Sequence, residues 1–151
     1  MPNKSFIDNI PSSLGTKELN VLFNKNKVFP NSKPTKLIKN MINISTSPND
    51  IILDFFAGSG TTGDAVMQLN AEDGGNRKYI LVQLPEPIDP KKNRIAYDFV
   101  KNELKIDNPT IFEITKERLI RAGKKIKTEI IKKKIEEKQD LGFKIYEVVD
   151  V

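Results

Sequence analysis

One stretch of sequence decides the fold, and it reads Ile51-Ile52-Leu53-Asp54-Phe55-Phe56-Ala57-Gly58-Ser59-Gly60-Thr61-Thr62-Gly63. Its first part is almost continuously apolar, which is typical of a strand in a parallel sheet that is covered on both faces. Two glycines then predict a sharp turn, and the residues after them favour a helix. Asp54 closes the strand, four residues before the first glycine. The stretch therefore predicts a strand, a turn and a helix, with an acid at the turn.

A second buried strand is expected after this helix, from Tyr79 to Leu84, beyond a turn at residues 72–76. The order of strand, helix and strand predicts a parallel βαβ unit with a right-handed crossover. Before this unit, Pro34 opens a helix whose apolar positions recur at helical spacing as far as Ile44. The predicted fold class is therefore α/β, with a mostly parallel sheet.

The C-terminal part is predicted to hold a long helix and a last strand. A helix is first expected over residues 93–104. Thr110 with Glu113 then fits a capping box, which starts a long helix that runs to about Lys138. Residues 143–149 alternate enough to predict a closing strand.

These elements divide one domain into three segments, because a chain of 151 residues is one domain by its length. Residues 1–33 are predicted to be rich in loops, with a short helix near residues 16–23. Residues 34–109 form the α/β core. Residues 110–151 add the long basic helix and the closing strand to the same domain.

Composition excludes several classes of site. The chain has no cysteine and no histidine. It therefore has no disulfide, no thiolate or imidazole metal site and no Ser/His/Asp or Cys/His triad, and we expect no metal. No apolar run approaches the ~18 residues of a membrane span. We expect a cytoplasmic protein without membrane contact.

Positive charge is concentrated in one segment. The whole chain has a net charge of +5, whereas residues 115–138 alone have +6. Such asymmetry favours a polyanion as partner. The candidates for contact with DNA phosphates are Arg118, Arg121, Lys124 and Lys125. The alternative is a solvated helix face, with a structural role for the two arginines.

The glycine turn predicts the class of ligand. Residues 58–63 match G-x-G-x-x-G between a strand and a helix, where free N–H groups favour an anion. A nicotinamide site would carry an acid at the end of the second strand, but Gln83 stands there, with Glu86 three residues later. Asp54 suits instead a positive group, such as the ammonium of S-adenosylmethionine. Gln83 or Glu86 would then contact its ribose.

Two motifs then carry a family resemblance. Residues 54–61 resemble the D-x-F-x-G-x-G-T signature of S-adenosylmethionine-dependent DNA amino-methyltransferases. Residues 28–38, which contain Lys33-Pro34-Thr35-Lys36-Leu37, are similar to the tenth motif of that family. In the β-ordered group the tenth motif directly precedes the glycine motif, as it does here. The resemblance implies a partial Rossmann-like methyltransferase fold.

Three further stretches narrow the resemblance. Residues 69–86, residues 117–122 and residues 140–144 resemble the modification subunit of type III restriction systems. The likeness covers residues 14–150 and corresponds to the C-terminal part of that subunit. It implies an adenine-N6 methyltransferase that acts on a flipped base, with double-stranded DNA, the N-terminal catalytic half and the restriction subunit as partners. A homodimer is also left open.

The resemblance implies a role for each matched residue. Asp54 and the turn would hold the methionine end of S-adenosylmethionine, and the tenth motif would close over it. Gln83 stands where many relatives carry an acid, so the ribose contact is open between Gln83 and Glu86. The implied cofactor-binding residues are Phe29, Lys33, Pro34, Asp54, Phe55, Phe56, Gly58, Ser59, Gly60, Thr61, Gln83 and Glu86.

The catalytic motif of the family, Asp/Asn/Ser-Pro-Pro-Tyr/Phe, does not occur in this sequence. In that motif a polar side chain and a carbonyl hold the target amine while the aromatic ring stacks on the flipped base. We therefore name no catalytic residue and expect no methylation by the chain alone. Two alternatives stay open: a catalytically inactive remnant that acts as a DNA-binding or assembly module, and a nicotinamide-binding oxidoreductase.

Overall fold

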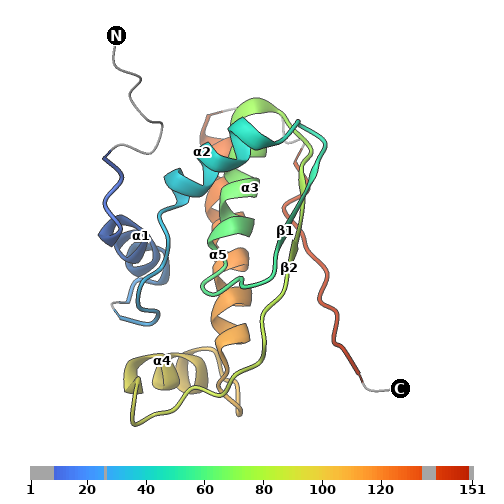
Figure 1. The fold of residues 1–151 in the computed structure, drawn as a ribbon. Coiled ribbons are helices and arrows are strands. Elements are labelled where there is room, and N and C mark those ends of the chain that lie inside the picture. The colour runs from blue at the N-terminus through green and yellow to red at the C-terminus, as the bar shows by residue number, and fades with distance from the viewer. Residues whose placement is uncertain (1–8, 26, 134–138, 150–151) are drawn as a thin grey trace.

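The computed structural model describes residues 9–25, 27–133 and 139–149 (Figure 1). Its elements follow in the order α1 (Ser13–Phe23), α2 (Thr35–Ser45), β1 (Ile51–Asp54), α3 (Thr61–Asp73), β2 (Lys78–Leu81), α4 (Arg94–Asp98), the π-helix η1 (Phe99–Glu103) and α5 (Ile111–Lys132). None of the helices in these ranges is both long and apolar enough to cross a membrane.

The predicted βαβ unit is confirmed. Strand β1 pairs with β2 in parallel, with Ile51 opposite Lys78 and Asp54 opposite Leu81, and α3 connects the two strands. These are the strands of the sheet in the described part of the chain. The α/β class and the parallel pairing therefore agree with the sequence prediction, although both strands are shorter than expected.

The helices pack together on one side of the sheet, where α3 lies between α2 and α5 (Figure 1). Leu119, Ala122 and Ile126 of α5 form a core with Met67 of α3. A separate core joins α1, the α4–η1 segment and the start of α5, and in it Phe23 stacks on Phe99 with ring centroids 5.1 Å apart. Helix α5 belongs to both cores and thus connects the two ends of the molecule.

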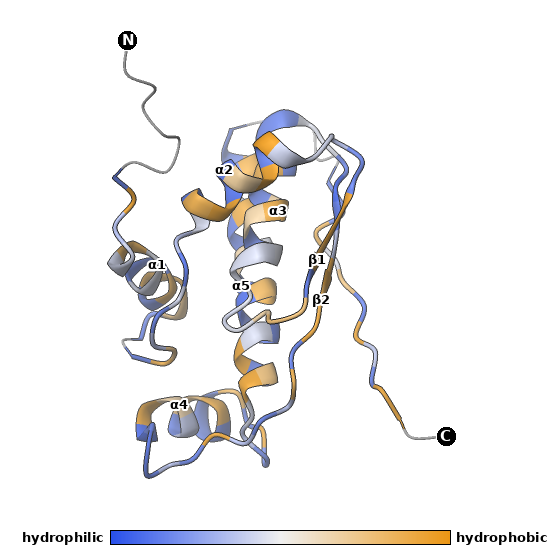
Figure 2. Cartoon of the chain, viewed as in Figure 1, coloured by the Kyte–Doolittle hydropathy of each residue, from blue (hydrophilic) through white to orange (hydrophobic). Residues whose placement is uncertain are grey.

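The expectation that the strands are buried on both faces is wrong. Ile52, Tyr79 and Leu81 pack against the helices. On the outer face, Ile51 and Ile80 are 61% and 52% exposed. Figure 2 shows the two strands as hydrophobic along most of their length. The reason is that the described helices cover only the inner face of this two-stranded sheet.

The predicted closing strand is also wrong, because residues 143–149 have no regular secondary structure. Leu141 and Phe143 pack against the core formed by α3 and α5. Beyond them, Tyr146 and Val148 are exposed. A strand requires a backbone ladder with a neighbour, and none of the described residues supplies one to this segment. The long basic helix is observed as far as Lys132, and residues 134–138 lie outside the described ranges.

The predicted capping box does not form. Thr110 is the residue before the first turn of α5, but its side chain makes no capping hydrogen bond. The carboxylate of Glu113 pairs with Lys116 instead of reaching back to the backbone of Thr110. The helix near residues 16–23 begins earlier, at Ser13. The helix over residues 93–104 is present as α4 followed by η1.

Candidate functional site

The glycine turn lies at the carboxyl end of β1, where parallel α/β sheets commonly bind ligands. Gly58 and Gly60 adopt left-handed φ angles of 54° and 81°. A Cβ at Gly60 would lie 3.2 Å from the carbonyl oxygen of Thr115 in α5. Glycine is therefore required at position 60 for its conformation and for the close approach of α5.

The turn is joined to the end of β2 by hydrogen bonds. The Ala57 N–H donates to the Val82 carbonyl at 3.1 Å, and the Gly58 N–H donates to Oε1 of Gln83 at 2.8 Å. The other end of the Gln83 amide donates to the Leu84 carbonyl at 3.1 Å. Gln83 thus orients the turn, whereas the side chain of Glu86 is exposed.

Asp54 accepts two hydrogen bonds that fix the conformation of the turn. One carboxylate oxygen accepts the Phe56 N–H at 3.0 Å, and the other accepts the Thr62 hydroxyl at 2.6 Å. Thr62 was not singled out from the sequence, because no local pattern joins its hydroxyl to an acid eight positions earlier. The half-buried carboxylate keeps acceptor capacity on both oxygens, because each can accept more than one hydrogen bond.

The segment that resembles the tenth motif lies against the turn. The hydroxyls of Ser32 and Ser59 are 2.8 Å apart, and the Thr61 hydroxyl donates to the Lys33 carbonyl at 3.3 Å. A Cβ at Gly58 would lie 3.5 Å from Cζ of Phe29. The structure therefore brings together the two segments that the sequence assigned to one site. Pro34 is buried at the start of α2, whereas the side chain of Lys33 is exposed.

Arg118 of α5 holds these segments together. Its guanidinium pairs with Asp64 at 3.0 Å and donates to the hydroxyl of Thr35 at 3.2 Å. The same guanidinium donates to the hydroxyls of Ser32, Ser59 and Thr61 at 2.9 to 3.1 Å. The arginine has no exposed surface. A buried charge needs such a set of partners to offset its lost hydration.

Two roles were left open for Arg118, and contact with DNA phosphates is wrong, because its guanidinium is fully buried. The structure gives this residue the structural role. Arg121 is half-buried, pairs with Glu117 at 2.6 Å and lies over the rings of Phe23 and Phe99. Among the candidates for contact with DNA, Lys124 and Lys125 are exposed. The cations of α5 therefore differ in exposure, although they are close together in the sequence. The spacing of apolar residues along the helix does not show which of these cations are buried.

Two aromatic side chains border the turn on its open side. Phe55 and Phe56 are 64% and 92% exposed. They stand beside a turn that combines a carboxylate, several hydroxyls and close backbone, an arrangement that suits a ligand with a cation at one end and an apolar ring at the other. In the described ranges, no cluster of acidic side chains is suited to hold a metal ion.

Comparisons with known proteins identify the family of the chain. A family model described as DNA methylase matches residues 2–97. The chain is 40% identical over 146 residues to the type III restriction-modification enzyme StyLTI Mod subunit of Salmonella typhimurium, with 96% of this chain and 20% of the relative covered. The EcoP15I Mod subunit of Escherichia coli is 35% identical over 146 residues, with 96% of this chain and 19% of the relative covered.

A methyltransferase of another type also matches. The type II methyltransferase M.KpnI of Klebsiella pneumoniae is 46% identical over 82 residues, which cover 54% of this chain and 19% of that relative. The chain spans about a fifth of the length of the curated relatives it matches. The resemblance to type III modification subunits is confirmed, and the chain belongs to the DNA methylase family of N6 and N4 methyltransferases.

Proposed function

We propose that this chain is the S-adenosylmethionine-binding portion of a DNA adenine-N6 methyltransferase, within the modification subunit of a type III restriction-modification system. The observation that carries the proposal is the contact between the turn and the segment around Phe29 and Ser32. Both segments carry the sequence signatures of cofactor motifs. Ser32 and Thr61 are 29 positions apart in the sequence, yet their hydroxyls belong to one hydrogen-bonded network. In this proposal β1, α3 and β2 are part of a Rossmann-like fold.

The residues of the turn have distinct roles in the proposed complex. The Asp54 carboxylate binds the ammonium of the methionine end, while Gly58 and Gly60 let the ligand approach the backbone. Phe29 and Pro34 form a wall of the site, with Lys33 and Ser59 at its border. S-adenosylmethionine bound there would supply an electrophilic methyl group to the exocyclic amine of a flipped adenine, which would lose a proton as the thioether product leaves. Glu86, rather than Gln83, is the stronger candidate for the ribose hydroxyls, because both ends of the Gln83 amide are engaged.

We expect that the chain alone does not methylate DNA. The sequence contains no Asp/Asn/Ser-Pro-Pro-Tyr/Phe motif, and the curated relatives are about five times longer. The adenine-binding residues would come from a catalytic half supplied by other chain segments, and a restriction subunit is the further proposed partner. Clear methylation of duplex DNA by the isolated chain would contradict this part of the proposal.

Calorimetric titration with S-adenosylmethionine tests the cofactor proposal. Asp54→Asn keeps the size of the side chain but replaces one carboxylate oxygen with an amide nitrogen and removes the charge, so we expect affinity to fall at least about tenfold. A urea midpoint measured on the same variant separates this effect from the loss of one hydrogen bond that the carboxylate accepts within the turn. Asp107→Asn is the matched control, because it makes the same change at an aspartate that is exposed and far in sequence from the turn. Equal affinity in the Asp54→Asn variant and the wild type would refute the ammonium contact.

The alternative function is a catalytically inactive remnant that serves in DNA binding or assembly. The observation that favours it is the exposed apolar face of the sheet, which is typical of an interaction surface. The same titration separates the two functions. Absence of heat with S-adenosylmethionine, together with a folded chain, would leave the remnant as the better account.

A further inference from the structure

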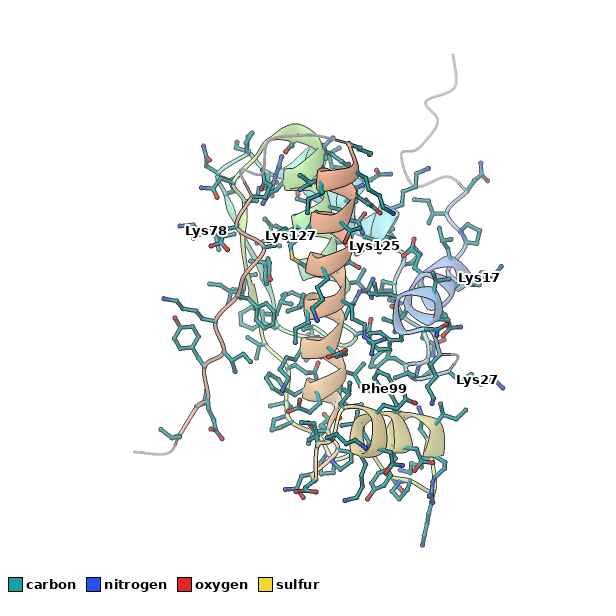
Figure 3. The ribbon with its side chains drawn as sticks, turned by 180° about the vertical axis from the view of Figure 1, so that it is seen from behind. Lys17, Lys27, Lys78, Phe99, Lys125 and Lys127 are labelled. Carbon is teal, nitrogen blue, oxygen red and sulfur yellow. The ribbon has the colours of Figure 1, made fainter. Side chains whose placement is uncertain are left out.

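A groove of about 830 Å³ lies between the loop after α1 and the segment that leads into α4. Its lining includes four cations, which are Lys27, Lys91, Lys92 and Arg94, and no carboxylate. Figure 3 shows Lys27 projecting outward beyond the end of α1, on the side of the molecule where α4 lies. The sequence did not single out this site, because its two halves are more than sixty residues apart.

The charges of this basic groove are largely unopposed. Arg94 pairs with Asp98 at 2.8 Å. Asp89 is the nearby acid on the same loop, and its carboxylate accepts the backbone N–H of Lys91 at 2.8 Å. Across the described residues, no carboxylate lies within 4.0 Å of the amino groups of Lys27, Lys91 or Lys92. The groove therefore carries a positive potential that an anion can neutralise.

Hydrogen bonds of Asn93 hold the backbone that carries these lysines. Asn93 donates to the Val28 carbonyl at 3.5 Å and so joins the two walls, and its side-chain oxygen accepts the Ala96 N–H at 3.0 Å. Val28 and Ala96 are both buried in the core that joins α1, the α4–η1 segment and the start of α5. The backbone that carries the basic side chains is therefore held in place by these hydrogen bonds and by the core. In this respect the groove differs from a row of charged side chains on a solvated helix face.

The groove also adjoins the proposed cofactor site. Phe29 lines the groove, and the same ring lies against Gly58 of the turn. A polyanion bound along the groove would therefore pass next to the position proposed for the methyl donor. A DNA backbone has to follow such a path if one of its bases is to reach that donor.

A second hollow, of about 660 Å³, provides the contrast. It adjoins Lys125 of α5 and is lined by four lysines but also by four acidic residues, so its charges balance. Two of these opposite charges, Lys39 and Glu72, form an ion pair. Although α5 belongs to the most basic segment of the sequence, the surface beside it is the weaker site for a polyanion.

We propose that the basic groove binds the sugar–phosphate backbone of DNA beside the methyl-donor site. This inference rests on the proposed function only for the choice of DNA as the polyanion. Phosphate contacts by lysine position a duplex without reading its sequence, and they release counterions, so binding in the groove should weaken steeply with salt.

The test is fluorescence anisotropy with a labelled duplex, using the full chain over a range of salt concentrations. Lys91→Glu with Lys92→Glu should weaken binding about tenfold and lower the slope of log affinity against log salt by about two. Lys124→Glu with Lys125→Glu makes the same change of charge on α5 and should have a clearly smaller effect. Lys91→Arg with Lys92→Arg should bind as the wild type does.

Equal losses in the two glutamate variants would overturn the proposal, as would a larger loss in the α5 variant or no DNA binding by the wild type at low salt. Calorimetry with S-adenosylmethionine on the same proteins keeps the two proposals distinct. If the cofactor does not bind but the groove variant alone loses DNA, the proposed cofactor site fails and the groove stands. If the cofactor binds but the two glutamate variants lose equal DNA affinity, the proposed cofactor site stands and the groove proposal fails.

Discussion

The polar network around Arg118 and the outer face of the sheet are two opposite environments within one βαβ unit. The network is buried and polar, whereas the outer face is exposed and apolar. In the network, a fully buried guanidinium has a carboxylate and four hydroxyls as partners, all within 3.2 Å. On the outer face, Ile51, Leu53 and Ile80 are each at least half exposed. The first region is internally satisfied, whereas the second has apolar side chains with no described neighbour to cover them.

This difference shows which part of the molecule is complete in itself. The polar network connects α2, the turn, α3 and α5, so its geometry depends on residues that are all in this chain. The outer face of a two-stranded sheet has few packing contacts, and isolated pairs of strands are marginally stable in water. Equal chemical changes in the two regions should therefore have very unequal effects on stability.

The largest effect is expected from Arg118→Met. The change leaves Asp64 as a buried carboxylate without its ion pair, and loss of one partner of such a pair commonly costs about 3–5 kcal/mol. Urea denaturation measures this cost. Arg94→Met is the control, since Arg94 forms an exposed pair within α4, and it should leave the midpoint of unfolding nearly unchanged. Equal midpoints for the two variants would contradict the structural role of Arg118.

The next effect concerns the turn that the network holds. Gly60→Ala combines a left-handed backbone with a Cβ only 3.2 Å from the Thr115 carbonyl. Gly74→Ala is the matched control, because Gly74 also has a positive φ, of 72°, but its Cβ would meet nothing within 4 Å. We expect about 1 kcal/mol of lost stability in the control and about twice that at Gly60. The same loss in both would mean that α5 does not constrain the turn.

A smaller effect is expected on the sheet, where the two faces can be compared directly. Leu81→Thr removes apolar contacts on the inner face, and it should cost about 1–2 kcal/mol. Leu53→Thr on the outer face should change stability by less than about 0.5 kcal/mol. Urea denaturation of both variants checks the difference. Similar losses would show that the outer face is covered, for example by a second copy of the chain, which light scattering would then detect.

The smallest effect is expected from Tyr79→Phe. The hydroxyl of Tyr79 is buried and has no hydrogen-bond partner among the described residues, so its removal should change stability by less than about 1 kcal/mol at pH 7. Burial and the charge of Asp140 raise the pKa of Tyr79 from 10.0 to about 12. The unfolded phenol ionises first, so the wild type should lose stability between pH 10 and 12.

The phenylalanine variant should lack this part of the loss, because it has no phenol to titrate. Thermal melts of both proteins from pH 8 to pH 11.5 measure the difference, which should widen above pH 10. A constant difference over that range would show that Tyr79 has an ordinary pKa.

Much of the site was predictable, because its signals lie close together in the chain. The glycines at 58 and 60, the acid before them and the segment around Lys33 each have a local meaning, and the structure places them side by side. The errors come from relations that no local pattern encodes. Arg118 looked like a surface cation because its partners, Asp64 and Ser32, are 54 and 86 positions away.

Local chemistry by itself therefore determined the βαβ order and the left-handed turn, because glycine conformation and apolar periodicity act over a few residues. The family resemblance also came from the sequence, through the motifs at residues 28–38 and 54–61. Only the tertiary structure decided which cations are buried, which face of the sheet is open and where Lys27 meets Lys91 in one groove. Burial and electrostatic potential are sums over all neighbours in space, so they follow from packing and not from the order of residues alone.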